Sequence, residues 1–357
     1  MSRIEGVTIE TFRGDYEGLE RMAHASWRDE YGQASFPNFY RPAFLHYLFD
    51  RIPGDKRDLL LGAYKDGEIV AFLANLPEKF HFQGGIRSAA YSCLLVVRKE
   101  YLRRGLAVDL VKTAVEINRT KHHFDFSLLT LETGHRSTKM MNKLKAEGHR
   151  LERVRKSGVV ARVLDLERVD ASEGLKGYEK AAIRLLGAHR PPKAAPEVEL
   201  RDYRPSDLDA CHALLERYKD TVKLALAWDK ADLALELDCP DVSETLVWER
   251  AGRIEAMINY IGHDQLGKTV ERYAWINHVA FPGLKPAERA AFLRAYLGRI
   301  RDRGYVATVD FNKRGWPAGP FYRAGFIPYP RAVNLVSWTF DPAISLAGIP
   351  VVYEIQV

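Results

Sequence analysis

The feature that most constrains the fold is an order of predicted strands and helices that occurs twice along the chain. In the first copy, apolar runs and alternating patterns predict strands over residues 6–12, 59–64, 69–80, 89–97, 124–132 and 158–166, and helical spacing predicts helices over 16–27, 42–49, 106–120 and 138–146. In the second copy, strands are predicted over 198–203, 244–249, 254–260, 273–281, 305–311 and 332–338, and helices over 206–218 and 287–302. An order of elements that recurs at similar spacing predicts tandem copies of one fold.

Length and a proline-rich segment set the predicted domain limits. A chain of 357 residues exceeds what one hydrophobic core usually holds. We predict one domain over residues 1–168 and another over 198–357, joined over 169–197 by a helix near 178–186 and the proline-rich segment 187–196. Because strands and helices alternate in both, the predicted fold class is α/β, with a twisted mixed sheet flanked by helices in each domain.

Composition narrows the class of protein. The 46% hydrophobic and 28% charged residues are typical of a soluble globular chain, and no apolar run is long enough to span a bilayer. We therefore expect a cytoplasmic monomer or homodimer with no membrane partner. Cys93, Cys211 and Cys239 match no zinc spacing, so no metal is expected. The net charge of +6 suits an anionic ligand such as a nucleotide and is too small to indicate nucleic acid binding.

A charged turn between a predicted strand and a predicted helix carries the clearest sign of ligand binding. The apolar run 94–97 leads through Arg103-Arg104-Gly105 into the helix. The first N–H groups of a helix lack partners inside it, a glycine lets a ligand approach the backbone, and arginines donate charge-assisted hydrogen bonds to phosphate. The turn lacks the Lys-Ser/Thr of a P-loop and the GxGxxG of a dinucleotide-binding fold. The pattern indicates a diphosphate site, and a charged surface turn with a glycine is the alternative.

The stretch 94–111 resembles the cofactor motif of the GNAT superfamily, the acetyl-CoA-dependent N-acetyltransferases. The family pattern is Gln/Arg-x-x-Gly-x-Gly/Ala after a strand. Gly105 and Ala107 fit this pattern, whereas Leu102 stands where Gln or Arg is usual. The element order of both halves is also similar to that fold, so the resemblance implies two tandem GNAT-like domains with acetyl-CoA as cosubstrate.

The resemblance also implies which residues hold acetyl-CoA. The backbone N–H groups that would bind its pyrophosphate belong to Arg103, Arg104, Gly105, Leu106 and Ala107. The backbone of Leu95 and Val97 would pair with the pantetheine arm, and Ser137 would lie near its sulfur.

The second half departs from the family motif. Its matching stretch, 278–289, places Ala287 and Arg289 at the two small positions, and Pro286 removes a backbone donor. We therefore expect this half to have lost the acetyl-CoA site and the first half to be the working one. The segment 321–326 still resembles the late Tyr-x-x-x-Gly-Phe segment of the family, one residue short, which favours a retained fold.

The resemblance gives candidates for the chemistry of acetyl transfer. The N–H of Leu95 would stabilise the oxyanion, and Tyr91 stands where many members carry a glutamate base. Glu132, at a strand end, is the carboxylate base that position favours, and His135 lies just beyond it. Leu144 stands where many members place a tyrosine acid, so thiolate protonation would rely on water.

These observations predict an acetyl-CoA-dependent N-acetyltransferase that acts on a primary amine of a small molecule by direct attack on the thioester. Two other readings stay open, namely a non-catalytic acyl-CoA-binding module and an aminoacyl-tRNA-dependent transferase of the related tandem type. The aromatic residues of segment 26–49 either wall the acceptor site or form core, and the sequence does not identify the amine.

Overall fold

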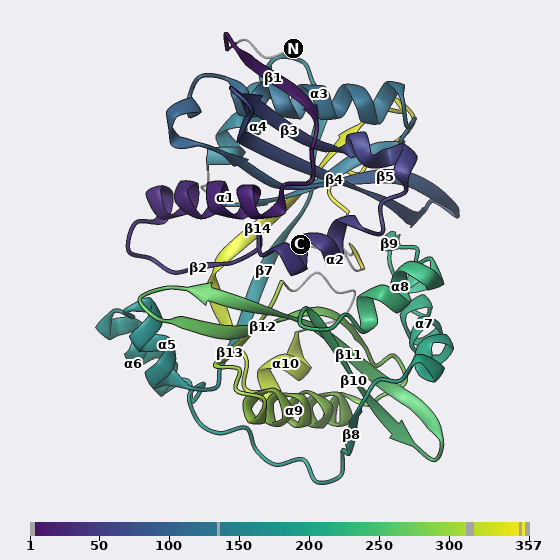
Figure 1. The fold of residues 1–357 in the computed structure, drawn as a ribbon. Coiled ribbons are helices and arrows are strands. Elements are labelled where there is room, and N and C mark those ends of the chain that lie inside the picture. The colour runs from purple at the N-terminus through teal and green to yellow at the C-terminus, as the bar shows by residue number, and fades with distance from the viewer. Residues whose placement is uncertain (1–3, 134–135, 312–317, 350–351, 354–357) are drawn as a thin grey trace.

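One mixed sheet runs through the molecule, with helices on both sides of it (Figure 1). The computed structural model describes residues 4–133, 136–311, 318–349 and 352–353. Its strands follow the order β1-β3-β4-β5-β6-β14-β7-β13-β12-β11-β10-β8, with β2, β9 and β15 paired at the sides of this path. The predicted α/β class with a mixed sheet flanked by helices is therefore confirmed.

The first half contains seven strands and four α-helices among the described residues. The strands are β1 (Val7–Thr11), β2 (Phe36–Pro37), β3 (Leu60–Lys65), β4 (Glu68–Phe82), β5 (Gly85–Val97), β6 (Phe126–Glu132) and β7 (Leu151–Val163). The helices are α1 (Tyr16–Tyr31), α2 (Pro42–Phe49), α3 (Leu106–Thr120) and α4 (Arg136–Ala146). Two 3₁₀ turns, Gly54–Leu59 and Lys99–Tyr101, precede β3 and α3.

The connecting segment and the second half follow the same pattern of elements. Helices α5 (Leu166–Glu173) and α6 (Gly177–Leu185) lie in the connection. The strands are β8 (Leu200–Asp202), β9 (Leu224–Leu226), β10 (Ser243–Arg250), β11 (Arg253–Leu266), β12 (Val270–Ala280), β13 (Ala307–Asp310), β14 (Ile327–Thr339) and β15 (Val352–Tyr353). The helices are α7 (Leu208–Glu216), α8 (Lys230–Leu237), α9 (Pro286–Asp302) and α10 (Gly319–Ala324), with 3₁₀ turns at Pro205–Asp207 and Lys219–Thr221.

The last long strand of each half completes the sheet of the other half. Strand β14 of the second half pairs antiparallel with β6, and β7 of the first half pairs antiparallel with β13. The two exchanged strands also pair with each other, from Ile327 opposite Ala161 to Trp338 opposite Leu151. The sheet is thus continuous across the predicted domain limits, which stay a prediction.

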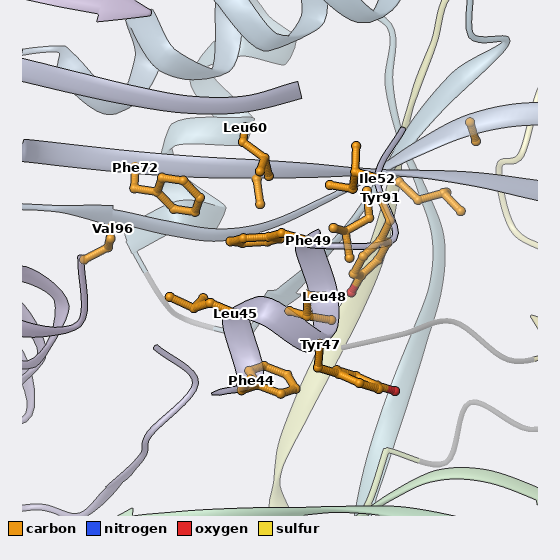
Figure 2. Close-up of a cluster of buried hydrophobic side chains, with 14 of the residues drawn as sticks. Phe44, Leu45, Tyr47, Leu48, Phe49, Ile52, Leu60, Phe72, Tyr91 and Val96 are labelled. Atoms are coloured by element: carbon orange, nitrogen blue, oxygen red, sulfur yellow. The ribbon is translucent and has the colours of Figure 1, made fainter. Parts of the chain in front are cut away.

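The core also joins the halves. One cluster of buried apolar side chains combines Phe72 and Phe126 of the first half with Leu224, Val242 and Ile344 of the second. Figure 2 shows its centre, where Phe49 of α2 lies between Phe72 and Tyr91 against β4 and β5. No helix among the described residues combines the length and apolarity needed to cross a membrane.

Candidate functional site

The turn that opens α3 has an unusual backbone conformation and no side-chain cap. Arg103 and Gly105 both adopt positive φ, 63° and 93°, and Gly105 is the N-cap residue of α3. No side chain in the described part of the chain caps this first turn. Successive N–H groups in such a conformation, at the positive end of a helix dipole, form a concave site for an anion.

Space and charge at this turn suit a phosphate group. A Cβ built on Gly105 would meet no described atom within 4 Å. Arg103 and Arg104 are exposed, and the Arg104 guanidinium lies 5.7 Å from the centre of the Tyr101 ring. The turn is therefore an open, positively charged surface beside unpaired helix N–H groups, which is what a diphosphate requires.

The strand before the turn carries a bulge and leaves its neighbour. Ala74 of β4 lies opposite Cys93, but Phe72 lies opposite Val96, so β5 holds one extra residue between these pairs. Leu94, within the bulge, has a positive φ of 54°. A bulge of this kind leaves backbone groups out of the ladder and turns them toward a neighbouring ligand.

Strand β5 pairs in parallel with β6 over 89–92 against 126–129 and not beyond this in the described chain. From Cys93 onward the two strands diverge, while β6 continues as far as Glu132 in its pairing with β14. Leu95, like Cys93 and Leu94, is only partly buried. The partly buried end of β5, where the two strands diverge, thus leads along the chain into the open turn of α3.

The predicted site residues belong to β5, β6, α4 and the turn that opens α3. Leu95 and Val97 belong to the diverging end of β5, which leads into the turn formed by Arg103, Arg104 and Gly105 and then into Leu106 and Ala107. Glu132 ends β6, and Thr138 of α4 donates a hydrogen bond to its carbonyl oxygen at 3.1 Å. Ser137 is the neighbouring residue in the first turn of α4, and His135 lies outside the described residues. The roles predicted for these residues stay predictions.

Tyr91 lies in the core and not on the open surface. Its side chain is 2% exposed, and its hydroxyl donates a hydrogen bond to Thr130 Oγ1 at 2.7 Å. Burial raises the pKa of this phenol well above its ordinary value. The hydroxyl is therefore a poor proton acceptor at neutral pH. Leu144, at the position where the family often has a tyrosine acid, is fully buried.

The corresponding turn of the second half is filled by the chain's own side chains. The Glu288 carboxylate accepts a hydrogen bond from the Lys285 N–H at 2.8 Å, which caps α9. The Arg289 side chain donates to the carbonyl oxygens of Leu284 and Pro282 at 2.8 and 3.2 Å. At this turn, unlike at the turn of α3, the Lys285 N–H therefore already has a side-chain partner.

A buried group of charged side chains where the two halves meet was not predicted from the sequence. It consists of Arg51, Glu78, Glu236 and His278, which come from four separate segments. His278 Nε2 lies 2.6 Å from Glu236, and Arg51 contacts Glu236 directly. The positions span more than two hundred residues, so no local pattern in the sequence indicated this group.

The chain is similar to known acyltransferases in part of its sequence and in its fold. A family model described as an acetyltransferase (GNAT) domain matches residues 13–130. No curated protein sequence matches the chain. A structure of Saccharomyces cerevisiae N-myristoyltransferase with bound myristoyl-CoA is similar to this chain with a TM-score of 0.77 at 14% identity, covering 98% of this chain and 90% of that one.

Two further structures share the fold more loosely. A GCN5-related N-acetyltransferase from Kribbella flavida matches with a TM-score of 0.51 at 13% identity, over 93% of this chain and 70% of that one. One from Anabaena variabilis matches with a TM-score of 0.53 at 9% identity, over 92% and 72%. The chain therefore matches a GNAT domain model over residues 13–130 and is similar in fold to these acyltransferases over nearly its whole length.

Proposed function

We propose that this protein is an acetyl-CoA-dependent N-acetyltransferase whose first half binds the donor and passes its acetyl group to a primary amine of a small molecule. The observation that carries the proposal is the uncapped, glycine-opened N-terminus of α3 directly after a strand that diverges from its neighbour. A diphosphate with a long amide-bearing arm fits that combination, because one end needs a cluster of N–H donors and the other needs unpaired strand edges. We propose a monomer or homodimer in the cytoplasm.

In this proposal the turn and the strand have separate tasks. The N–H groups of Arg103, Gly105, Leu106 and Ala107 and the two arginine side chains hold the pyrophosphate, while the Arg104 N–H donates to the Tyr101 carbonyl oxygen at 3.3 Å. The backbone of Leu95 and Val97 pairs with the pantetheine arm, and the Leu95 N–H, beside the bulge, stabilises the oxyanion. Ser137 lies beside the thioester sulfur, and Glu132, the carboxylate of β6, lies at the end of that strand.

The chemistry then needs few protein groups. The amine nitrogen attacks the carbonyl carbon of the thioester, and the carbon–sulfur bond breaks when the tetrahedral intermediate collapses. Holding the amine and the thioester in reacting geometry supplies much of the acceleration, and one fixed oxyanion donor is worth about 3 kcal/mol. The proton lost by the amine requires an acceptor.

Packing favours a short acyl group. The side chains that cover the inner face of β4 and β5 next to Tyr91 are buried and aromatic or branched, among them Phe49, Phe72, Phe80 and Phe126. Figure 2 shows Phe49 and Ile52 directly beside Tyr91. A long acyl chain that entered here would have to displace this core, whereas an acetyl group would not.

The whole-length similarity to N-myristoyltransferase supports a second candidate, transfer of a long acyl chain to an amine. That similarity extends over both halves, whereas the similarity to the two GCN5-related N-acetyltransferases has a lower TM-score. At 14% identity it concerns the fold, so the donor has to be decided by measurement.

The test offers the purified chain acetyl-CoA or myristoyl-CoA with a panel of primary amines that includes benzylamine, spermidine and a peptide with an N-terminal glycine. Acylated product is identified by mass spectrometry. Turnover with acetyl-CoA supports the first proposal, and turnover with myristoyl-CoA alone supports the second. Binding of either donor without any product would instead indicate a non-catalytic acyl-CoA module, and no binding would favour an aminoacyl-tRNA-dependent transferase.

A further inference from the structure

The buried charged group at the join of the two halves includes Glu78 of β4, the strand that pairs with the bulged strand β5. Arg51 follows α2, Glu78 belongs to β4, Glu236 to α8 and His278 to β12. The exposed fractions of these side chains are 9%, 15%, 4% and 0%. Removing charged side chains from water costs folding free energy unless they are paired, so a buried group of this kind points to a function.

The two carboxylates of the group differ in how they are held. Glu236 has close partners on both sides, since Arg51 contacts one oxygen and His278 Nε2 lies 2.6 Å from the other. Glu78 has only Arg51, at 3.8 Å, and accepts no hydrogen bond from the described residues. Its carboxylate also keeps the largest exposed fraction of the four side chains. Glu78 is thus the member with oxygen lone pairs left for a further donor.

The charges around Glu78 separate the pKa values of the two carboxyl groups. Burial raises the pKa of Glu78 to about 7, although Arg51 opposes the rise. For Glu236, Arg51 and His278 overcome burial and hold the pKa at about 2. The charged groups that act on the pKa of Glu78 are Arg51, Glu236, Asp232 on α8 and His278. Arg51 is the permanent cation among these four. A carboxyl poised near neutrality beside a second, always ionised one is suited to accept a proton.

Strand register places Glu78 on the same face as the bulge. Glu78 lies opposite Ala89, Leu76 opposite Tyr91 and Ala74 opposite Cys93 in the β4–β5 pair. Residues directly opposite share a face, and every second residue returns to it, so Glu78 and Cys93 point to the same side. Burial raises the pKa of the Cys93 thiol, and the charges of Arg51 and Glu78 also act on it, in opposite directions.

A second polar atom on this side lacks a partner. The Tyr40 hydroxyl is buried and has no hydrogen-bond partner in the described structure, and Cys93 is among the groups that raise its pKa. A buried hydroxyl is ordinarily satisfied by protein, water or ligand. Near Cys93 there are thus one buried hydroxyl without a partner in the described structure and, farther along the same face, one incompletely paired carboxylate.

The second half of the chain supplies the side chains that hold His278 and Glu236 in place. Strand β12 has its own bulge, where Asn277 is the extra residue between Ile276 opposite Tyr260 and His278 opposite Asn259. Asn277 donates to Asn259 at 3.0 Å and lies 3.4 Å from the Tyr47 hydroxyl. In Figure 2 that hydroxyl points away from Phe49 and Leu45 of the same helix. The bulge of the second half thus fixes His278 and, through it, Glu236.

We infer that Glu78 is the group that takes the proton from the acceptor amine, directly or through a water molecule, with Arg51, Glu236 and His278 as its positioning residues. The inference rests on the proposed acyl transfer. The acceptor enters as an ammonium, loses one proton to the Glu78 carboxylate and attacks the thioester carbonyl as the neutral amine. A second proton leaves the nitrogen when the tetrahedral intermediate collapses, the carbon–sulfur bond breaks, and the thiolate takes that proton from solvent.

The test compares Glu78→Gln with Asp232→Asn, which removes an exposed carboxylate from the same neighbourhood. Acetyl transfer is measured against pH with benzylamine, which must lose a proton, and with aniline, which is already neutral. Glu78→Gln is expected to lower kcat/KM for benzylamine by about 100-fold or more and to abolish the acidic limb of its pH profile. Transfer to aniline should fall by less than ~10-fold, and acetyl-CoA affinity should not change. Asp232→Asn should keep its activity and shift the limb to lower pH, because a negative charge near Glu78 is lost.

The outcomes separate this inference from the proposed function. If wild type transfers acetyl groups and Glu78→Gln does so equally well, or loses both acceptors to the same extent, the inference is wrong and the proposed function stands. If wild type transfers acetyl to no amine of the panel, both are overturned. Weaker acetyl-CoA binding by Glu78→Gln would assign Glu78 a structural role and also overturn the inference.

Discussion

Replacing Glu78 by glutamine should make the protein more stable at pH 8 and hardly affect it at pH 5. The folded chain holds the pKa of this carboxyl at about 7, against an ordinary value of 4.5. Between these values the folded state binds a proton that the unfolded state has lost, so folding stability falls as pH rises. A shift of about 2.5 pKa units at ~1.4 kcal/mol each gives a cost of about 3 kcal/mol above pH 7, fully absent below pH 4.5. Glutamine resembles the protonated acid and removes that cost.

The assay is urea unfolding of wild type and Glu78→Gln at pH 5 and pH 8, followed by tryptophan fluorescence. The variant should gain up to about 3 kcal/mol at pH 8 and less than about 1 kcal/mol at pH 5. Equal stability at both pH values would show that Glu78 titrates normally. A loss of stability at pH 8 would show that its ion pair with Arg51 outweighs the desolvation of the carboxylate, and the reasoning would be refuted in either case.

Three further predictions follow from the geometry. Gly105→Ala and Gly304→Ala both place a Cβ in open space at positive φ, so each should lower the free energy of unfolding by ~1 kcal/mol. Only Gly105→Ala should weaken acetyl-CoA binding, by ~10-fold or more in calorimetric titration. Tyr91→Phe loses only its hydrogen bond to Thr130 and should cost ~1 kcal/mol in urea unfolding with unchanged acetyl transfer; a large loss of transfer would assign the phenol a catalytic role. Glu236→Gln should destabilise the chain by ~3 kcal/mol or more at pH 7, because the buried charges of Arg51 and His278 lose their carboxylate partner. The difference should shrink as pH falls from 4.5 toward 2, where wild-type Glu236 takes up a proton, and a constant difference would contradict the low pKa of Glu236.

The local patterns of the sequence predicted most of the elements. The helix predicted over 42–49 is α2, Pro42–Phe49, and that over 287–302 is α9, Pro286–Asp302. The open turn was also predictable, because it consists of adjacent residues between a strand and a helix whose spacing is visible in the sequence. Short strands such as β2 and β9 were missed, since two or three residues carry no measurable periodicity.

What the sequence did not predict depends on partners far apart in the chain. Strands β7 and β14 are exchanged between the halves, so each pairs with a strand of the other half. The apolar pattern of a strand does not depend on which strand it pairs with, so the sequence did not predict this exchange. The contact of Arg51 with Glu236 joins positions 185 residues apart. Burial likewise changed the meaning of Tyr91, which by position resembles a site residue and by packing belongs to the core.

The stoichiometry of acetyl-CoA binding, measured by calorimetric titration of wild type, Gly105→Arg and Arg289→Ala, tests the central claim most directly. The open turn of α3 and the filled turn of α9 predict one site per chain, which is lost in Gly105→Arg and retained in Arg289→Ala. Two sites in wild type, or a site that survives in Gly105→Arg, would contradict the assignment of the donor to the first half.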